Sequence, residues 1–284
     1  MPASTTRFVL VTGASTGIGR ACALDLAAHG FSVFATVRRA EDARALEAEG
    51  LPHLRPLFLD VTDGAAIAAA AGTVGTATGE AGLWGLVNNA GIVLAAPLEA
   101  IPLDAFRRQL EVNVTGQLAV TQAFLPLVRR ARGRIVNMGS IGGISVIPFV
   151  GAYCASKFAL EAISDALRME LAPWGIEVVI VEPGTVTTPI WRKGEEAADA
   201  ILSRIDPGVV SLYREAMERM RRVVAAAETR GAPPEVVAAA VRHALTARRP
   251  KTRYLVGPVA RMRWVLQRLL PDRLRDRLLR RLLA

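Results

Sequence analysis

Cysteine and histidine are scarce in this chain of 284 residues. It contains two cysteines, Cys22 and Cys154, and three histidines that lie far apart, His29, His53 and His243. Two cysteines cannot build the disulfide framework of a small secreted domain, and neither set of residues has the spacing of a zinc site. We therefore expect no metal centre and no dependence on disulfide bonds.

Long apolar runs and low-complexity segments are also missing. No stretch of about 18 apolar residues predicts a spanning helix, and no basic, apolar and small-residue succession predicts a signal peptide. Glycine and proline number 24 and 16, too few for a collagen-like or low-complexity chain, whereas hydrophobic residues make up 51% and can form a sizeable core. We expect a folded cytoplasmic protein.

Positive charge is concentrated at the end of the chain. The net charge is +9, yet residues 248–284 hold 12 basic and two acidic residues, so this segment carries +10 and residues 1–247 carry −1. A nucleic-acid enzyme more often distributes basic residues around its active cleft. The charge pattern favours a nearly neutral catalytic body that binds no nucleic acid, followed by a basic segment.

Segments of two periodicities alternate along the chain. Helical spacing predicts helices over 17–30, 40–50, 63–80, 102–131 and 151–173. Short apolar runs predict strands over 8–11, 32–37, 54–61, 83–88, 134–138, 176–182 and 252–256. Strands that alternate with helices are typical of a parallel sheet covered on both faces. We therefore predict a single-domain α/β Rossmann fold, with a doubly wound parallel sheet of about seven strands.

Two segments lie outside this alternation. Residues 190–232 carry charged helical sequence, which predicts a helical lid over the substrate, with a surface insertion as the alternative. The predicted catalytic domain spans residues 1–257 and includes this lid. Residues 258–284 form a predicted basic C-terminal extension.

The extension alternates arginine with apolar residues. Leu274, Leu278 and Leu282 recur at four-residue intervals, and Pro271 is placed to start this last helix. A basic amphipathic helix can lie on an anionic membrane surface, or it can dock on its own domain or on a partner subunit. We therefore expect a cytoplasmic protein that is either free or peripheral at a membrane.

A glycine cluster, TGASTGIG at residues 12–19, joins the first predicted strand to the first predicted helix. Gly13 allows a sharp turn, Gly17 allows a pyrophosphate to approach the backbone, and Gly19 allows helix and strand to pack closely. The N-terminus of the helix then offers unpaired N–H groups and partial positive charge to phosphates. The segment predicts a dinucleotide site, although its spacing is not GxGxxG.

Tyr153 and Lys157 are four residues apart on a predicted helix, so their Cβ atoms share one face at about 5–6 Å. A phenol with the usual pKa near 10 is a poor acid–base catalyst at neutral pH, and a nearby ammonium group lowers that pKa. Tyr153 can then take the proton of an alcohol as hydride leaves, or return it to a ketone. The alternative is a surface pair without a chemical role.

Residues 8–189 resemble the short-chain dehydrogenase/reductase family, both in the glycine cluster and in further segments. The family fingerprint TGxxxGxG is joined here by Asp60-Val61, by NNAG at 88–91, and by PGxxxT at 183–188. The resemblance implies that Asp60 touches adenine and that Thr188 meets the nicotinamide carboxamide. All predicted cofactor-binding residues are Gly13, Ser15, Thr16, Gly17, Ile18, Gly19, Arg38, Arg39, Asp60, Val61, Asn89, Ala90, Gly91, Tyr153, Lys157, Pro183, Gly184, Val186 and Thr188.

The resemblance also implies a catalytic tetrad of Asn113, Ser140, Tyr153 and Lys157. Ser140 stands 13 residues before Tyr153 at the end of the fifth predicted strand, where ligands of open α/β sheets bind, and would hydrogen-bond the substrate oxygen. Asn113 would support a water-linked proton relay to Lys157. This role is compatible with a residue that satisfies backbone groups at a helix kink.

The end of the second strand bears on the choice of cofactor, and its sequence VFATVR resembles the 17β-hydroxysteroid dehydrogenase branch. An acidic residue there would bind the ribose 2′-OH, which Thr36 and Val37 cannot do, whereas Arg38 and Arg39 can pair with a 2′-phosphate. NADP(H) is therefore favoured. NAD(H) remains the alternative, because Thr16 stands where many NADP-preferring relatives carry Arg or Lys.

Apolar residues follow Ser140 and open the 190–232 segment, and they line the predicted substrate pocket unless they pack a core or an oligomer interface. The similarity to hydroxysteroid and retinol dehydrogenases implies a lipophilic substrate, such as a steroid, a retinoid or a long-chain compound. These pocket residues are Ile141, Ile144, Val146, Ile147, Pro148, Phe149, Ile190 and Trp191.

We therefore predict an NADP(H)-dependent oxidoreductase that interconverts an alcohol and a ketone or aldehyde, with Tyr153 as the general acid and base. By analogy with the family, we expect a homodimer or homotetramer. The alternatives are an NAD(H)-dependent enzyme of the same family and a cofactor-binding regulatory protein without turnover. The complete tetrad argues against the regulatory protein.

Overall fold

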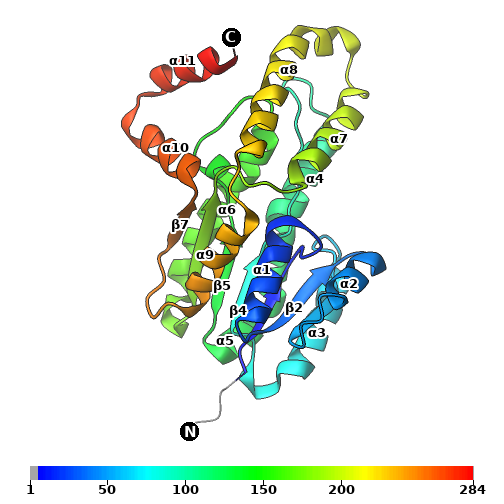
Figure 1. The fold of residues 1–284 in the computed structure, drawn as a ribbon, viewed down its shortest axis with the longest axis vertical. Coiled ribbons are helices and arrows are strands. Elements are labelled where there is room, and N and C mark those ends of the chain that lie inside the picture. Colours follow the sequence, from blue (N-terminus) through cyan, green and yellow to red (C-terminus); the bar gives the residue numbers. More distant parts are fainter. Residues whose placement is uncertain (1–5, 284) are drawn as a thin grey trace.

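One parallel sheet of seven strands forms the centre of the molecule (Figure 1). The computed structural model describes the backbone of residues 6–283 and the side chains of residues 6–278. The strand order is β3-β2-β1-β4-β5-β6-β7, and all neighbouring strands are parallel, which confirms the predicted doubly wound sheet. The strands are β1 (Phe8–Val11), β2 (Ser32–Val37), β3 (Leu54–Phe58), β4 (Gly85–Asn88), β5 (Arg134–Met138), β6 (Glu177–Pro183) and β7 (Arg253–Val256).

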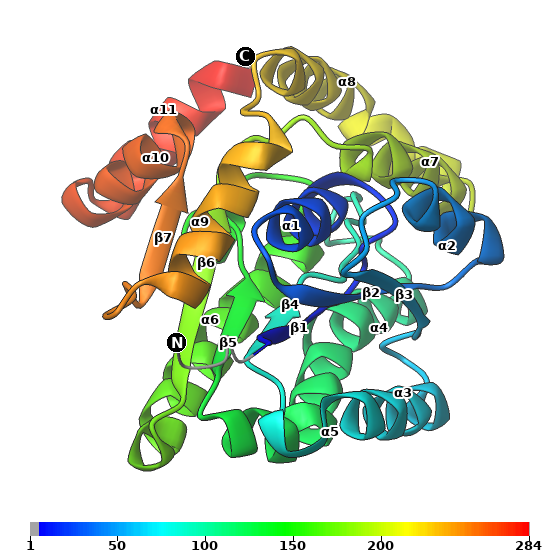
Figure 2. The ribbon, with the colours of Figure 1, turned by 60° about the horizontal axis from the view of Figure 1, so that its bottom comes forward.

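Helices cover both faces of this sheet (Figure 2). Along β1, Val9 and Val11 pack in one core with Leu26 of α1, whereas Leu10 packs in the opposite core with Phe124 of α5. This alternation follows from the two-residue period of a strand, and it buries β1 on both faces. The helices are α1 (Gly17–Ala28), α2 (Ala40–Glu47), α3 (Gly64–Thr78), α4 (Leu103–Leu110), α5 (Gly116–Ala131), α6 (Gly151–Leu171), α7 (Ile190–Leu202), α8 (Pro207–Thr229), α9 (Pro234–Thr246), α10 (Pro258–Leu269) and α11 (Asp272–Leu283).

The largest departure from the predicted strand bounds is in β3, which ends at Phe58 instead of residue 61. The chain turns there because the Asp60 carboxylate accepts hydrogen bonds from the Thr62 N–H at 2.9 Å and from the Thr62 hydroxyl at 2.8 Å. The turn leaves Asp60 at the carboxyl end of the strand, beside the ends of β1 and β2.

The chain is helical from Leu103 to Ala131, which confirms the predicted long helix over 102–131, and a π-helical turn at Glu111–Thr115 within it joins α4 to α5. Asn113 lies buried in this turn and pairs with the backbone of Ile92. Its Nδ2 donates to the Ile92 carbonyl at 3.0 Å, and its Oδ1 accepts from the Ile92 N–H at 2.9 Å. These bonds hold the loop after β4 against the turn. Such turns occur often at functional sites.

The two segments outside the alternation are helical, and Figure 1 shows their helices together at one end of the sheet. The 190–232 segment forms α7 and α8, as predicted, while α9 has no counterpart among the predicted helices. The C-terminal extension forms α10, which packs against β7 and the short turn Ile141–Gly143, and α11, which packs against α8.

Docking on its own domain is therefore the arrangement that the extension adopts, and contact with a membrane surface stays a prediction. Leu282 falls outside the residues whose side chains are described. Within residues 6–283, none of the helices combines the length and the apolar character needed to traverse a bilayer.

Candidate active site

The glycine turn after β1 lies against the loop that follows β4. Gly13 has φ +65°, and a Cβ atom there would lie 2.9 Å from the Cα of Ala90. At Gly19 a Cβ atom would lie 2.3 Å from both the Asn89 Nδ2 and the Gly13 carbonyl oxygen. Neither position has room for a side chain, so these glycines set the close approach of the two loops.

Thr12 and Asn89 bond the two loops to each other. The Thr12 hydroxyl accepts hydrogen bonds from the backbone N–H of Asn89 at 2.9 Å and of Ala90 at 3.0 Å. The Asn89 amide donates in return to the carbonyls of Thr12 at 2.9 Å and Gly13 at 3.1 Å. Thr12 is absent from the predicted site residues, and its place as the first residue of the glycine motif is the signal for it.

These loops border a cavity of about 430 Å³ at the carboxyl ends of β1, β2, β3 and β4. The helix α1 begins at its wall, and its N-cap residue, Thr16, makes no side-chain hydrogen bond to the first turn. The N–H groups of that turn therefore suit an anion such as a pyrophosphate. The predicted residues that line the cavity are Gly13, Ser15, Thr16, Ile18, Gly19, Arg38, Arg39, Asp60, Val61, Asn89, Ala90, Gly91 and Thr188.

Thr36 of β2 and Lys193 of α7 also line this cavity and were not predicted to do so. The Thr36 hydroxyl accepts from the Gly13 N–H at 3.1 Å, so it shapes the glycine turn. Lys193 adds a positive charge on the side of Thr188. No sequence signal distinguishes Lys193 from the other charged residues of the 190–232 segment.

The two arginines after β2 have different partners. Arg38 is 65% exposed, and its nearest carboxylate is that of Asp60, 3.6 Å away. Arg39 donates to both oxygens of Asp42 at 3.0 and 3.1 Å, and it also lies 3.2 Å from the carboxylate of Glu41. Arg38 is therefore available to bind a further anion, whereas the carboxylates of Asp42 and Glu41 already pair with Arg39 at the start of α2. Of the two arginines predicted to bind a 2′-phosphate, Arg38 is the better placed.

A smaller cavity of about 90 Å³ continues the first one toward α6. The predicted residues at its wall come from the ends of β5 and β6 and from α6. They are Ser140, Tyr153, Lys157, Pro183, Gly184 and Val186. The two cavities share the lining residues Ile18, Asn89, Gly91, Ile92, Thr188 and Ile190. Gly17 lies next to Thr188, one of these shared residues: a Cβ atom at Gly17 would be 3.2 Å from the Thr188 side chain.

Three of the predicted catalytic side chains meet at the carboxyl end of β5. Tyr153 and Lys157 lie on one face of α6, with the Lys157 Nζ 5.8 Å from the centroid of the Tyr153 ring. The Lys157 ammonium donates to the Met138 carbonyl at 2.7 Å. Ser140 follows β5, and its hydroxyl accepts from the Gly142 N–H at 3.0 Å. The spacing of four residues thus produces the shared face that the sequence predicts.

Burial disfavours the charged forms of both Tyr153 and Lys157. It raises the pKa of Tyr153 to about 12, partly offset by a hydrogen bond from Ser140, and it lowers the pKa of Lys157 to about 8, opposed by the Glu161 carboxylate. The sequence predicts a lowered phenol pKa, and the structure shows the opposite direction. Desolvation is the larger effect, because the ammonium bonds the Met138 carbonyl instead of the phenol.

Asn113, the fourth member of the predicted tetrad, reaches α6 through Ser156. Its Nδ2 lies 3.0 Å from the Ser156 hydroxyl oxygen, and that hydroxyl donates to the Tyr153 carbonyl at 2.6 Å. Asn113 therefore braces α6 beside Tyr153 as well as the loop after β4. The water-linked relay to Lys157 stays a prediction.

Behind Lys157 two glutamates lie close together. Glu182 of β6 is fully buried, and Glu161 of α6 accepts hydrogen bonds from Arg253 of β7 at 3.1 and 3.2 Å. Burial and the Glu161 carboxylate raise the pKa of Glu182 to about 8. Two carboxylates in this space repel each other, so the folded protein favours a protonated Glu182.

We expect Glu182→Gln to stabilise the protein above neutral pH. The unfolded carboxyl loses its proton near the usual pKa of 4.5, whereas the folded one keeps it to about 8, so wild-type stability falls as the pH rises between these values. The variant should gain on the order of 2 kcal/mol in free energy of unfolding at pH 8 and little at pH 4. Denaturant unfolding at both pH values measures this difference.

Glu177→Gln is the matched control, because Glu177 is exposed on the same strand. Equal pH dependence in the wild type and in Glu182→Gln would contradict the assignment of the buried acid.

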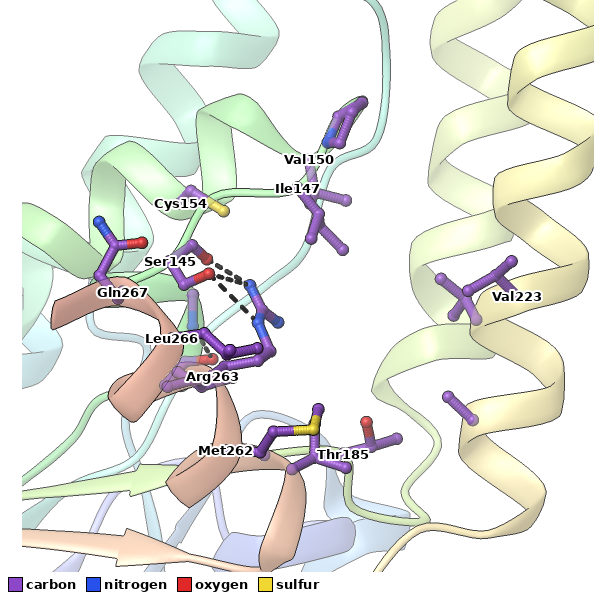
Figure 3. A pocket seen from close by; sticks show the side chains of 18 of the residues that line it. Ser145, Ile147, Val150, Cys154, Thr185, Val223, Met262, Arg263, Leu266 and Gln267 are labelled. Atoms are coloured by element: carbon purple, nitrogen blue, oxygen red, sulfur yellow. Dashed lines mark hydrogen bonds between the residues drawn. The ribbon is translucent and has the colours of Figure 1, made fainter. Parts of the chain in front are cut away.

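A third cavity, of about 330 Å³, opens on the other side of Ser140 and Tyr153. Apolar side chains from the segment after Ser140, from α8 and from α10 form most of its wall (Figure 3). Of the predicted pocket residues, Ile141, Ile147, Pro148 and Trp191 line it.

The other predicted pocket residues lie elsewhere. Phe149 lines a neighbouring cavity of about 60 Å³, and Ile190 lines the two cavities on the glycine-turn side. Ile144 and Val146 line none of these cavities, and Val146 is 49% exposed. The C-terminal extension was not predicted to contribute to the pocket. In the structure Met262, Leu266 and Leu270, four residues apart, line the 330 Å³ cavity.

Ser140, Tyr153, Gly184 and Trp191 line both the 330 Å³ cavity and the 90 Å³ cavity. A hydroxyl and a phenol thus lie where the cavity that continues to the glycine turn meets the apolar cavity. Such an arrangement can hydrogen-bond an oxygen atom of one ligand and exchange a proton with it, beside the end of a second ligand.

The chain matches the family model for short chain dehydrogenases over residues 7–199. It is 40% identical to retinol dehydrogenase 5 of Mus musculus, over 98% of this chain and 89% of the mouse protein. It is 36% identical to an NADPH-dependent 3-dehydrocapnine reductase of Ornithobacterium rhinotracheale, over 96% of this chain and 95% of that protein.

Solved structures agree with this placement. A short-chain dehydrogenase from Streptomyces avermitilis superposes with a TM-score of 0.79 at 32% identity, covering 98% of this chain and 96% of that one. A short chain dehydrogenase from Burkholderia cenocepacia in complex with NADP has a TM-score of 0.72 at 27% identity and covers 98% of both chains. The chain therefore belongs to the short-chain dehydrogenase/reductase family, in its retinol dehydrogenase branch, and is an NAD(P)-dependent oxidoreductase.

Proposed function

We propose that this protein is an NADP(H)-dependent oxidoreductase that interconverts a lipophilic alcohol and its ketone or aldehyde. The observation that carries the proposal is the position of Ser140 and Tyr153 between the apolar cavity and the cavity that continues to the glycine turn. A substrate oxygen at this junction is within reach of both side chains, while the rest of the substrate lies among apolar residues.

The glycine turn and the N-terminus of α1 would hold the pyrophosphate of the cofactor, Asp60 and Val61 its adenine, and Thr188 its nicotinamide amide. The first turn of α1, whose N–H groups have no side-chain cap from Thr16, fits this ligand. The cofactor supplies hydride transfer to or from the substrate carbon.

The remaining chemistry belongs to the side chains of this protein. Ser140 donates a hydrogen bond to the substrate oxygen and holds it near Tyr153. Tyr153 gives its proton to that oxygen during reduction and takes it back during oxidation. The Lys157 ammonium, 5.8 Å from the centroid of the Tyr153 ring, would partly offset the burial that opposes the phenolate as the proton leaves. Asn113 keeps α6 in position through Ser156.

Three observations support NADP(H) over NAD(H). Arg38 has no carboxylate nearer than 3.6 Å and lines the cavity at the end of β2, where a 2′-phosphate would lie. Thr36 and Val37 form the cavity wall at the end of β2, and neither has a carboxylate that could accept a hydrogen bond from a ribose 2′-OH. One relative is named as NADPH-dependent, and one similar structure contains NADP.

The apolar wall of the 330 Å³ cavity supports a lipophilic substrate, as does the similarity to a retinol dehydrogenase. The grouping of Ser140, Tyr153 and Lys157 supports turnover over a purely regulatory role. The homodimer or homotetramer stays a prediction.

Oxidation of NADPH by a panel of ketones and aldehydes tests the proposal. Burial of each methylene group contributes about 0.8 kcal/mol, so four additional methylene groups within the cavity should raise kcat/KM roughly 200-fold over a short ketone. The loss of reduced-nicotinamide absorbance measures the rate. NADPH binding without turnover of any steroid, retinoid or long-chain compound would favour the regulatory alternative.

A further inference from the structure

The apolar cavity contains an arginine that no carboxylate of the described residues neutralises. Arg263 of α10 lines it beside Ile147 and Cys154 (Figure 3). Its Nε lies 3.3 Å from the Ser145 hydroxyl oxygen, and its Nη2 lies 3.1 Å from the same atom and also donates to the Ser145 carbonyl. Within the described side chains, no ion pair includes Arg263.

Burial of such a group is unfavourable without a counter-charge. It lowers the pKa of Arg263, because the charged form loses contact with water. The oxygens of Ser145 accept hydrogen bonds but carry no net charge. The other cation at the wall, Arg275, bonds to the Asp272 carboxylate and to the Gln267 carbonyl. Arg263 is therefore the cation at this wall whose charge remains without a partner.

The guanidinium lies near the site of the chemistry. Ser145 is joined by its N–H to the Ile141 carbonyl at 2.9 Å, directly after Ser140, and Cys154 directly follows Tyr153. Figure 3 shows the third guanidinium nitrogen turned away from Ser145, toward the open side of the cavity across from Val223. Ser140, Tyr153 and Arg263 line the same cavity, so one elongated ligand can contact all three side chains.

We propose that the lipophilic substrate carries an anionic group, such as a carboxylate, and that Arg263 binds it. This inference rests on the proposed function and names the substrate class more closely. Charge-assisted hydrogen bonds from the guanidinium hold the anion, while the apolar part of the substrate contacts Met262, Leu266 and Val223. The arginine thereby selects an amphiphilic acid over a neutral lipid.

Binding of two matched probes tests this inference without turnover. Dodecanoate and dodecanamide have the same length and differ in charge, and each is titrated into the protein saturated with NADP. We expect the wild type to bind dodecanoate roughly 10- to 100-fold more tightly than dodecanamide. Arg263→Met should reduce this ratio to about one through weaker binding of dodecanoate alone. Arg263→Gln, which can still bond to Ser145, repeats the comparison if the methionine variant does not fold.

Arg261→Met is the matched control, because Arg261 lies on the same helix and is exposed. It should leave the ratio unchanged. A ratio in Arg263→Met equal to that of the wild type overturns the inference and leaves Arg263 as an anchor of α10. Acetate that binds as tightly as dodecanoate also overturns it, because a free anion would then suffice.

Turnover of neutral ketones separates this inference from the proposed function. If neutral lipophilic ketones are reduced while the probe ratio is one, the anion site is wrong and the proposed function holds. If neither neutral ketones nor long-chain keto acids are reduced but the ratio is lost in Arg263→Met, the anion site holds and the proposed function is wrong.

Discussion

Replacement of Tyr153 by Phe is expected to lower kcat/KM roughly 1,000-fold or more while the affinity for NADP(H) stays nearly unchanged. The substitution removes the phenol oxygen and keeps the ring that lies between the two cavities. The glycine turn, the N-terminus of α1 and Arg38, which we propose to bind the cofactor, are untouched. Steady-state rates together with a titration of NADPH fluorescence measure the two effects separately.

Tyr213→Phe is the matched control for this variant, because Tyr213 lies on α8, where its hydroxyl bonds to the Glu99 carboxylate. Its turnover should stay within a few-fold of the wild type. A Tyr153→Phe enzyme that kept most of its turnover would assign the proton transfer to another group. Loss of NADPH binding in that variant would instead show that the phenol oxygen is needed to assemble the cofactor site.

The second large effect is expected from Arg38→Asp, which should reverse the preference for NADP(H). A charge-assisted hydrogen bond to the 2′-phosphate contributes roughly 1.5–3 kcal/mol, so its removal weakens NADP(H) binding about 10- to 100-fold. The new carboxylate repels the phosphate and accepts hydrogen bonds from the ribose 2′-OH of NAD(H). The ratio of kcat/KM for the two cofactors should therefore fall by roughly 100-fold or more.

Arg39 offers a comparison on the neighbouring residue. It already bonds to Asp42 and lies beside Glu41, so Arg39→Gln should change the cofactor ratio little, whereas Arg38→Gln should lower NADP(H) affinity. An equal loss of NADP(H) affinity in both glutamine variants would contradict the separate roles that the structure gives these arginines.

Local patterns predicted the elements that position the site. The apolar runs of β1 and β5 are short and buried on both faces, so they are recognisable in the sequence without knowledge of their neighbours. The four-residue spacing of Tyr153 and Lys157 fixes their shared face, because helix geometry alone determines it. The glycine cluster at residues 12–19 combines a turn, a close approach and a helix start in one segment.

Other features depend on partners distant in the sequence and could not be predicted in this way. The π-helical turn at Asn113 forms where its side chain bonds to Ile92, in the loop after β4. The upward shift in the pKa of Tyr153 results from burial, which the residues of α6 do not reveal. Arg263 and α10 become part of the wall of the apolar cavity through packing on β7.

Hydride should pass between cofactor and substrate at the junction formed by Ser140 and Tyr153. Reduction of a long-chain ketone with NADPH that carries deuterium at the nicotinamide C4 tests this step. We expect the wild type to form an alcohol with one deuterium on the carbinol carbon, and Tyr153→Phe to form none. Bound cofactor that yields no deuterated alcohol from any lipophilic ketone or aldehyde would contradict it.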